Sequence, residues 1–454
     1  MKTIRIGAGM GYWGNGCSGA KTMVERGNIQ YLCSDGLSEL TLAILKKSAK
    51  KNAYAGWVNE LTQFMETVLV PCKEKGIKII CNHGGLNPVG AIDEIKRIAG
   101  TLGVTGLKVA AVTGDNVYDK LEGWHAAGVD LSNFDTHESY ENIKDRVMFV
   151  NAYIGAWPIV EALQNGADIV ITGRCADSAL FLAPMIYELG WNWDDVDKLA
   201  AGTLVGHLLE CSAQSTGGNF LGDWQSIERM GEIGYPIAEV MESGDFIITK
   251  PEDTGGRVDV ETVSEQMLYE TLDPHNYMAP DVIADFTTPT LTDLGNDRVL
   301  VTGMKGKPRP QTLKVFLGYQ NGWASSKMVL YSWPDVLQKA KRLEEILRWH
   351  IQDQHLEVDE LNVSMIGVNS VHGATAPIPP EDEINEAAVK VTIRTKKRED
   401  AQKFIRIGMS LDGPPATAGS FGFAGKPREL LGPWSTLVDR NEIEPDIAIT
   451  YGEV

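Results

Sequence analysis

The chain has 454 residues, which at about 150 residues per domain indicates two or three domains. Hydrophobic residues make up 43% of the sequence and charged residues 23%, close to the averages of a soluble globular protein. A disordered tail, a small disulfide-rich scaffold and a fibrous repeat are therefore excluded. The 42 Lys and Arg residues against 61 Asp and Glu residues give a formal net charge of −19. Because such a surface repels phosphate groups, we expect no nucleic-acid partner and no membrane partner.

The cysteine pattern and the N-terminus bear on the compartment. The six cysteines include no C-x-x-C pair and no regular spacing, which indicates reduced thiols in a cytosolic protein. The first apolar stretch breaks at Gly7, so it does not have the form of a signal peptide. No run of about 18 apolar residues occurs anywhere in the sequence. We therefore expect a cytoplasmic protein.

The first 200 residues alternate between short apolar runs and longer segments of helical periodicity. Runs that are apolar throughout, without a period of two, are typical of parallel strands buried on both faces. The pattern predicts an α/β fold with a mostly parallel, Rossmann-like sheet and flanking helices. The predicted strands are residues 3–8, 30–33, 77–81, 107–112 and 168–171, and the predicted helices are residues 37–51, 58–75, 89–102 and 137–164.

The sequence pattern of the remaining residues predicts a mixed α/β region over residues 201–352 and a small C-terminal α+β domain over residues 353–454. A charged helix at 334–352 ends the first of these, so we expect one core domain over residues 1–352, with the parallel sheet in residues 1–200. The acidic, proline-rich segment 376–386 is expected to be a solvated loop. The other predicted elements are a helix at 204–212, strands at 246–249, 282–286, 299–302 and 313–317, strands at 361–369, 387–394 and 447–451, and a helix at 397–409.

All five predicted parallel strands end in glycine-containing polar loops. In an open parallel sheet, ligands bind at the carboxyl ends of the strands. Glycine in any one loop could be simple turn chemistry, but five such loops at one edge predict a functional site there. The loops are GAGMGYWGNG (7–16), SDG (34–36), NHGGLNP (82–88), TGDN (113–116) and TGRCADS (172–178).

The first loop also matches a dinucleotide-binding fingerprint. Gly9, Gly11 and Gly14 form G-x-G-x-x-G after a predicted strand, and Asp35 follows about 20 residues later, where the ribose-binding acid is expected. The segment between them is short and contains Gly16 and Gly19. A nicotinamide or flavin cofactor is therefore the less favoured alternative.

A second constellation lies in the helix predicted at 204–212. His207, Glu210 and Cys211 would share one helix face, where they could bind a divalent metal or pair a thiol with a base. The alternative is a buried cysteine beside a hydrogen-bonded histidine. The residues that follow would offer backbone N–H groups to an oxyanion or carboxylate, and they are Gly217, Gly218 and Asn219.

The remaining candidates follow the third, fourth and fifth strands. Arg174 has the guanidinium fork that suits a carboxylate, and Asp177 could pair with it, act as a base or, as we favour, cap the next helix. His83 and Asp115 are candidate acid–base groups or metal ligands, or alternatively turn residues. The polar and small neighbours expected to bind substrate are Asn82, Gly84 and Asn116.

Six of these motifs together resemble the acyclic terpene utilisation (AtuA) family over about residues 4–345. They are GAGMGYWG, NHGGLNP, VTGDN, GADIVITGRCADSAL, GHLLECSAQSTGGNF and YMAPDVIADF. The last 100 residues are similar to that family's variable C-terminal region. The resemblance implies a bacterial cytoplasmic protein of catabolism, acting on acyclic terpenes or other branched carboxylic acids, often as CoA thioesters.

These observations favour an enzyme that acts on a small branched carboxylic acid or its CoA thioester, as a hydro-lyase or an isomerase. Such a reaction needs an acid, a base and enolate stabilisation, but no redox cofactor, and a divalent metal is compatible with it. The alternatives are a non-catalytic ligand-binding subunit and an NAD-dependent oxidoreductase. We expect a small anionic substrate and a homo-oligomer, with or without a small partner subunit. The expected catalytic groups are His83, Asp115, His207 and Glu210, and the expected substrate-binding groups are Gly9, Gly11, Asn82, Gly84, Asn116, Arg174, Asp177, Gly217, Gly218 and Asn219.

The placement of these residues after successive strands makes one geometric prediction. If the strands are parallel neighbours, their carboxyl ends meet at one edge of the sheet. The residues expected to border a single pocket there are Gly9, Asn82, His83, Asp115, Arg174 and His207.

Overall fold

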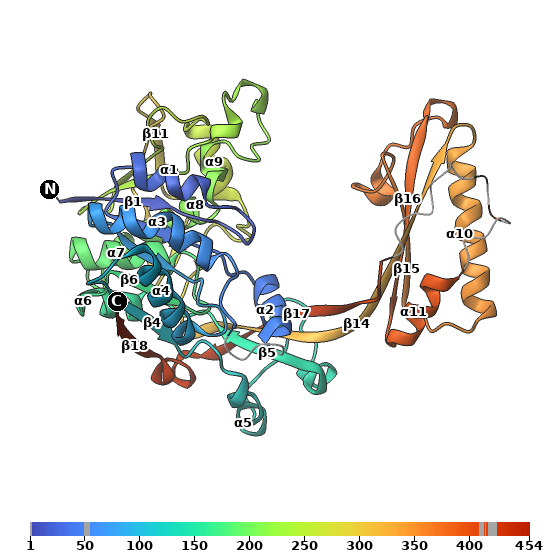
Figure 1. Ribbon diagram of the computed structural model, residues 1–454, viewed down its shortest axis with the longest axis horizontal. Helices are drawn as coiled ribbons and strands as arrows, with labels where there is room; N and C mark the ends of the chain where they lie inside the picture. The colour runs from blue at the N-terminus through green and yellow to red at the C-terminus, as the bar shows by residue number, and fades with distance from the viewer. Residues whose placement is uncertain (1, 50–54, 408–412, 414, 416–424) are drawn as a thin grey trace. The chain divides into compact units, whose positions relative to one another are not determined.

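The computed structural model describes residues 2–49, 55–407, 413, 415 and 425–454. The chain forms two compact units (Figure 1). The first unit comprises residues 1–142, 148–318 and 433–454, and the second comprises residues 143–147 and 319–432. In the described part of the chain, no helix is long and apolar enough to cross a bilayer.

The first unit is built on a ten-stranded mixed sheet. Its centre consists of five strands in the order β1-β2-β3-β6-β4, and each adjacent pair is parallel. These strands are the five that the apolar runs predict, because strands covered on both faces must be apolar throughout. Their bounds are β1 Thr3–Ala8, β2 Tyr31–Ser34, β3 Lys78–Cys81, β6 Ile169–Thr172 and β4 Lys108–Thr113.

Antiparallel strands extend this centre at both edges. Strand β7 pairs antiparallel with β1, and β8, β12 and β11 continue outward from it. On the other side the C-terminal strand β18 pairs antiparallel with β4. The sheet is therefore parallel only at its centre and mixed as a whole. The added strands are β7 Ile237–Met241, β8 Phe246–Thr249, β12 Val299–Thr302, β11 Thr290–Asp293 and β18 Ala448–Glu453, and a separate small sheet contains β9 Tyr277–Met278, β10 Ile283–Asp285 and β13 Lys305–Lys307.

Two sets of helices cover the parallel centre. Helices α1, α3 and α4 pack side by side, and so do α6, α7 and α8. Right-handed crossovers put these sets on opposite faces, because the chain crosses the sheet in one direction from β1 to β4 and then turns back to β6. The helices of this unit are α1 Ser18–Arg26, α2 Glu39–Ala49, α3 Leu61–Lys75, α4 Pro88–Leu102, α5 Leu121–Ala126, α6 Trp157–Gln164, α7 Ala179–Leu189, α8 Val196–Glu210 and α9 Val260–Leu268.

One predicted helix is wrong in its first half. Residues 137–164 contain a strand, β5 Val147–Ala152, before the short helix α6. The β5 sequence VMFVNA is rich in β-branched and apolar residues, which favour a strand. Pro158 lies in the first turn of α6, where a missing N–H has no cost, and so the helix begins only there.

The second unit has an antiparallel sheet in the order β15-β16-β14-β17. Strand β16 alternates buried and exposed side chains, and Val389, Val391 and Ile393 pack in one core with Leu343 and Phe404 from the helices. The elements are β14 Thr312–Ser332, α10 Val336–Asp353, β15 Glu360–Ile366, β16 Glu386–Thr395, α11 Arg398–Arg406 and β17 Arg428–Asp439. The predicted helix ends at 50–51 and 408–409 lie outside the described residues.

The expected domain boundary at residue 353 differs from the division in the structure. Strand β14 continues from the first unit into the second, and α10 packs on β16, so both belong with the later residues. Residues 433–454 return to the first unit, because β18 completes its sheet. The sequence predicted only 313–317 as strand, since Gly318 and Gly322 are typical of a break in a strand rather than of its interior.

Candidate active site

A cavity of about 560 Å³ opens at the carboxyl ends of the parallel strands, within the first unit. Its volume falls in the range of ligand-binding pockets. The loop after β1 contributes Gly11 and Tyr12, and the loop after β6 contributes Arg174 and Asp177. The loop after β2 contributes Asp35, and the end of α8 contributes Glu210, together with other residues of these segments.

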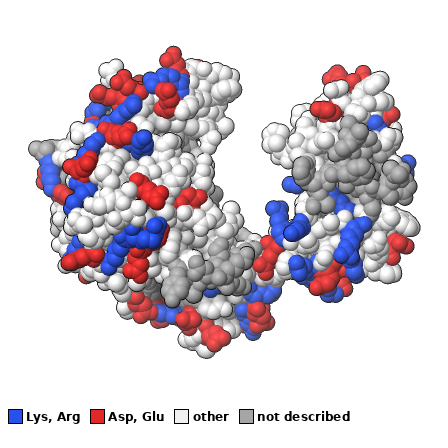
Figure 2. Space-filling model, in the orientation of Figure 1, with Lys and Arg blue, Asp and Glu red and all other residues white. Residues whose placement is uncertain are grey.

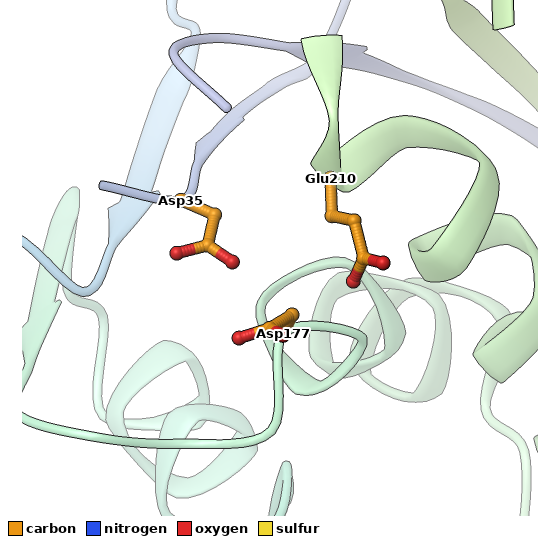
Figure 3. Close-up of side chains that lie close together, drawn as sticks. All are labelled: Asp35, Asp177 and Glu210. Carbon is orange, nitrogen blue, oxygen red and sulfur yellow. The ribbon is translucent and has the colours of Figure 1, made fainter. Parts of the chain in front are cut away.

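Three carboxyl groups from these segments converge in the cavity (Figure 3). One oxygen each of Asp35, Asp177 and Glu210 lies within 4.8 Å of the other two. Like charges at this spacing repel one another unless a proton or a cation neutralises part of the charge. The three groups could therefore share protons or hold one divalent cation, which prefers carboxylate oxygens.

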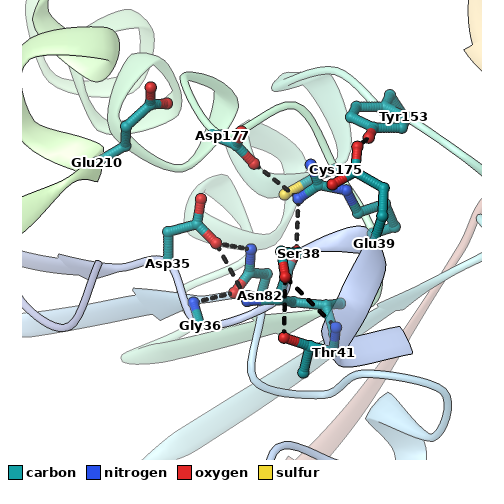
Figure 4. Close-up of polar contacts among 12 residues, drawn as sticks. Asp35, Gly36, Ser38, Glu39, Thr41, Asn82, Tyr153, Cys175, Asp177 and Glu210 are labelled. Atoms are coloured by element: carbon teal, nitrogen blue, oxygen red, sulfur yellow. Dashed lines mark hydrogen bonds and ion pairs between the residues drawn. The ribbon is translucent and has the colours of Figure 1, made fainter. Parts of the chain in front are cut away.

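Asp35 is held by an amide from the neighbouring strand. Asn82, fully buried after β3, donates from Nδ2 to Asp35 Oδ1 at 2.5 Å and accepts from the Gly36 N–H at 2.8 Å (Figure 4). Burial and the nearby Asp177 carboxylate raise the pKa of Asp35 well above its ordinary value, and Arg174 and Asn82 only partly offset them. Burial therefore favours the protonated form of Asp35.

Asp177 is held by Arg174, three residues earlier in the same loop. Arg174 Nη1 donates to Asp177 Oδ1 and to the Leu37 carbonyl, both at 2.7 Å. The Arg174 backbone N–H in turn donates to Asp115 Oδ2 at 2.8 Å, and Asn151 donates to the same oxygen. Burial raises the pKa of Asp115 to about 6. Asp177 thus pairs with Arg174, in place of the capping role expected for it.

Glu210 is held by His207, one turn earlier on α8. His207 Nδ1 lies 3.0 Å from Glu210 Oε1. The ring packs against Tyr277 and Phe286, with centroid distances of 5.4 and 5.5 Å. Burial raises the pKa of Glu210 to about 7, although the hydrogen bond and charge of His207 lower it. Burial also opposes protonation of His207, but Glu210 outweighs that effect and the pKa of His207 is raised.

The three carboxyl groups are therefore positioned in the same way. Each reaches the cavity from a different segment, and each is fixed by its own buried polar partner, namely Asn82, Arg174 or His207. A buried polar group without a partner costs free energy, so these pairs stabilise the fold while they orient the carboxyl groups. The geometry suits proton transfer to and from a ligand in the cavity.

Comparison with known proteins supplies a family. A family model described as acyclic terpene utilisation family protein AtuA matches residues 4–449. The chain belongs to the AtuA family. The match confirms the resemblance of the N-terminal motifs and extends it through the C-terminal region.

Curated proteins and solved structures provide no further relative of this AtuA-family chain. No curated protein matches it. A crystal structure of homoserine dehydrogenase from S. aureus at pH 6.5 has 10% sequence identity, with 88% of this chain and 95% of that chain covered. Its TM-score of 0.12 is too low to support a shared fold.

The predicted site residues divide into those that line the AtuA cavity and those that lie beneath it. Of the six residues expected to border one pocket, only Arg174 does so. Gly9 and Asn82, the first residues after β1 and β3, are buried beneath the cavity, whereas Asp35, the first residue after β2, reaches it. The predicted residues that line the cavity are Gly11, Arg174, Asp177, Glu210, Gly218 and Asn219, and those that do not are Gly9, Asn82, His83, Gly84, Asp115, Asn116, His207 and Gly217.

His83 illustrates the covered class. Its Nε2 lies 3.1 Å from Ser34 Oγ, its ring meets the edge of Phe64, and a Cβ at Gly36 would lie 2.9 Å from that nitrogen. Burial lowers the pKa of His83 to about 3, so the ring stays neutral at physiological pH. His83 therefore does not line the cavity, because the loop at Gly36 covers it, and its role as an acid, base or ligand stays a prediction.

The expected oxyanion-binding amides are also already occupied. The Gly217 N–H donates to the Gln214 carbonyl at 3.2 Å, and the Gly218 N–H donates to the Ala213 carbonyl at 2.9 Å. These bonds close the turn after α8, so the two amides are not free to bind an anion. Asn219 remains exposed at the cavity wall.

The small residues of the predicted set allow close approach of segments. A Cβ at Gly9 would lie 2.8 Å from Ser34 Cβ, and one at Gly84 would lie 2.6 Å from the Thr172 carbonyl oxygen. Asn116 forms an isolated bridge with Asn151. These positions therefore pack the loops together beneath the cavity.

The geometry of the first loop argues against the dinucleotide fingerprint. A Cβ at Gly11 would lie 2.5 Å from the Glu210 carbonyl oxygen, so the loop packs directly on the end of α8. Its N–H donates to Asn15 Oδ1 at 2.8 Å. The backbone is thus used within the protein and is not left open for a pyrophosphate. Asp35 belongs to the carboxylate cluster instead of a ribose site.

Sequence reasoning missed one wall of the cavity. Glu39, the first residue of α2, lines the cavity, and Tyr153 and Lys314 contact it from behind. These three residues are far apart in the sequence and follow no motif, so only the fold brings them together. The aromatic residues Tyr12, Tyr235 and Tyr269 also line the cavity without a sequence signal.

Proposed function

We propose that this AtuA-family chain is a catabolic enzyme, a hydro-lyase or an isomerase, that acts on a small branched carboxylic acid or its CoA thioester. Family membership suggests a role in acyclic terpene utilisation. The observation that carries the reaction type is the cluster of Asp35, Asp177 and Glu210 in one cavity. Carboxyl groups whose environments separate their proton affinities are typical of acid–base catalysis.

Glu210 is the general acid–base group of the proposal. Burial brings its pKa to about 7, so it can both accept and donate a proton near neutral pH. In a dehydration, Glu210 takes a proton from the carbon next to the substrate's carbonyl group. A protonated Asp35 gives its proton to the departing hydroxyl group, which leaves as water. In an isomerisation, Glu210 returns the proton that it has taken to a different carbon of the substrate.

Arg174 is the one basic residue among the described residues that line the cavity, beside acidic residues such as Glu39 and Glu270, and its guanidinium group suits a substrate carboxylate. Arg174 lines the cavity, and its Nη2 has no hydrogen-bond acceptor among the described residues. Helices α2 and α7 both begin at this edge, and helix N-termini favour anions. Figure 2 shows acidic and basic side chains interspersed over the visible face of each unit.

A metal-assisted version of the same reaction is the second candidate, favoured by three carboxyl oxygens that lie within 4.8 Å of one another. A divalent cation there would neutralise the carboxylates and stabilise an enolate. The two versions differ in the role of Glu210, which transfers the proton in the first and contacts the cation in the second.

A thermal-shift panel tests the proposal. Di- and tricarboxylates, branched acids and their CoA thioesters are each added with and without Mg²⁺, Mn²⁺ or Zn²⁺, and stabilising compounds are then assayed for turnover. We expect an acid or thioester to stabilise the protein and be converted by the purified chain. Stabilisation by NAD alone, or turnover only after a partner protein is added, would contradict the proposal in favour of an oxidoreductase or a non-catalytic subunit.

The variant Glu210→Gln separates the two versions, and Glu228→Gln at an exposed position is its control. In the acid–base version, Glu210→Gln removes turnover and leaves any response to metal unchanged. In the metal-assisted version, it removes the metal-dependent stabilisation, because an amide is a poorer ligand for a hard divalent cation.

A further inference from the structure

Tyr153 lies directly behind one wall of the cavity, between two cations. It follows β5 and is 8% exposed. The Arg174 guanidinium carbon lies 4.2 Å from the centre of its ring, and Lys314 Nζ lies 4.5 Å from the same centre. The Tyr153 backbone N–H donates to the Lys314 carbonyl at 2.9 Å, which fixes the two segments side by side.

The hydroxyl group of the same residue holds the anion of this wall. Tyr153 donates to Glu39 Oε1 (Figure 4), and Lys314 Nζ lies 3.6 Å from the same oxygen. Burial alone would raise the pKa of Glu39, but Arg174, the Tyr153 hydroxyl and Lys314 outweigh burial and lower it to about 2. Glu39 is therefore ionised at neutral pH, and its charge offsets the two cations on the ring.

The orientation of the Arg174 guanidinium depends on these contacts. Its Nη1 is committed to the Leu37 carbonyl and to Asp177. The guanidinium carbon lies over the Tyr153 ring, and this contact limits rotation of the group. Among the described residues Nε and Nη2 have no acceptor, so the ring helps to determine where these remaining donors point.

We propose that Tyr153 is a positioning residue of the cavity. Its ring orients Arg174 to receive a ligand carboxylate, and its hydroxyl group keeps Glu39 away from that carboxylate. The proposal rests on the proposed function, because it assigns a carboxylate to the same site. It adds a residue that neither the motifs nor the cavity lining identifies.

Reactivity of Arg174 toward phenylglyoxal, read by peptide mass spectrometry of the full chain, tests the positioning. Tyr153→Met fills a similar volume without a ring, and Tyr153→Phe keeps the ring without the hydroxyl group. The matched control is Tyr451→Leu, since Tyr451 also lies under a lysine, with Lys108 Nζ 4.6 Å from its ring centre. Arg440, which is 4% exposed, is the internal reference for unfolding.

We expect Arg174 to react about tenfold faster in Tyr153→Met, which corresponds to the loss of one desolvated cation–π contact. It should stay protected in Tyr153→Phe and Tyr451→Leu, and Arg440 should stay protected throughout. Equal protection of Arg174 in Tyr153→Met and the wild type would overturn the proposal. Faster reaction of both arginines would also overturn it, because Tyr153 would then be a general core residue.

A binding measurement separates this proposal from the proposed function. For the carboxylate of the panel that stabilises the wild type most, Kd should rise in Tyr153→Met and less in Tyr153→Phe. Unchanged Kd in both variants would contradict the positioning role and leave the proposed function standing. A panel without any binder would contradict the proposed function, while the phenylglyoxal result would still report whether Tyr153 orients Arg174.

Discussion

At the scale of the residue, the cavity separates carboxyl groups by their surroundings. Burial raises the pKa of Asp35 and of Glu210, whereas two cations and a hydroxyl group outweigh burial and lower the pKa of Glu39. Burial therefore favours the protonated forms of Asp35 and Glu210, whereas Glu39 is ionised at neutral pH. This division is the physical basis for assigning proton transfer to Glu210 and Asp35.

The pH dependence of stability follows from Glu210. Its pKa is about 7 in the folded chain and about 4.3 when unfolded, so the folded state binds more protons between these values. The stability contributed by this group is complete below about pH 4 and is lost as the pH rises through 7. Glu210→Gln removes the titration.

Urea unfolding of chelator-treated protein at several pH values measures this effect. From pH 5 to pH 8, we expect the wild type to lose on the order of 2–3 kcal/mol relative to Glu210→Gln. Glu228→Gln, at an exposed position, should follow the wild type. Parallel pH profiles for the wild type and Glu210→Gln would mean that Glu210 has an ordinary pKa.

Part of the site can be predicted from the sequence, because the residues concerned lie in short segments that the local sequence pattern identifies. Arg174, Asp177 and Glu210 reach the cavity from a strand-end loop and a helix end that the sequence pattern identifies. His83, Asp115 and His207 carry suitable chemistry, but side chains from other segments cover them. Glu39 depends on contacts with Tyr153 and Lys314, which lie more than 100 residues away along the chain. Such contacts leave no pattern in a single sequence.

At the scale of the element, the parallel centre of the sheet could be predicted and the rest only in part. Strands buried on both faces must be continuous apolar runs, and this is a strong signal. Strand β5 was predicted as helix because it is short and is followed by a helix. Strand β14 was predicted only at its start, since glycines interrupt it.

The contact between the β1 loop and α8 gives a prediction at this scale. A Cβ at Gly11 would meet backbone atoms at the end of α8, 2.5 Å from the Glu210 carbonyl oxygen. Gly11→Ala should therefore displace the loop or the helix end and cost about 1–3 kcal/mol of stability, as overpacking does. It should also weaken binding of any ligand that contacts Glu210.

Gly100→Ala is the matched control, because a Cβ at this position of α4 meets no atom within 4 Å. Alanine in a helix interior is better than glycine by about 0.5–1 kcal/mol, so this variant should be neutral or more stable. Thermal unfolding of both variants measures the difference. Equal stability of Gly11→Ala and Gly100→Ala would show that the loop is not packed on α8.

At the scale of the whole molecule, residues 319–432, which form most of the second unit beside the short segment 143–147, are an insertion into the first. The chain leaves the first unit after Gly318 in β14 and returns at Pro433 in β17, and these two strands are neighbours in one sheet. The cavity, its carboxyl groups and their buried partners all belong to the first unit. The insertion therefore leaves the site's own residues contiguous in space.

Replacing residues 319–432 by a short Gly–Ser turn tests this organisation. Because β14 and β17 are adjacent, a hairpin can join them, and we expect the first unit to fold cooperatively with its strands intact. Far-UV circular dichroism and the thermal-shift response to the ligand panel measure the outcome. A shortened chain that aggregates or loses cooperative unfolding would show that the first unit depends on the second.

The central claim is that the cavity's carboxyl groups exchange a proton with a bound acid. The most direct test uses ¹H NMR to measure deuterium exchange in D₂O. The exchange is measured at the carbon next to the carbonyl group of the panel acids and thioesters. We expect exchange or conversion with the wild type and Glu228→Gln. In Glu210→Gln it should fall by about 10²–10⁴-fold, the usual contribution of a general acid–base group. Exchange that persists unchanged in Glu210→Gln, or no exchange with any compound that binds, would contradict the account.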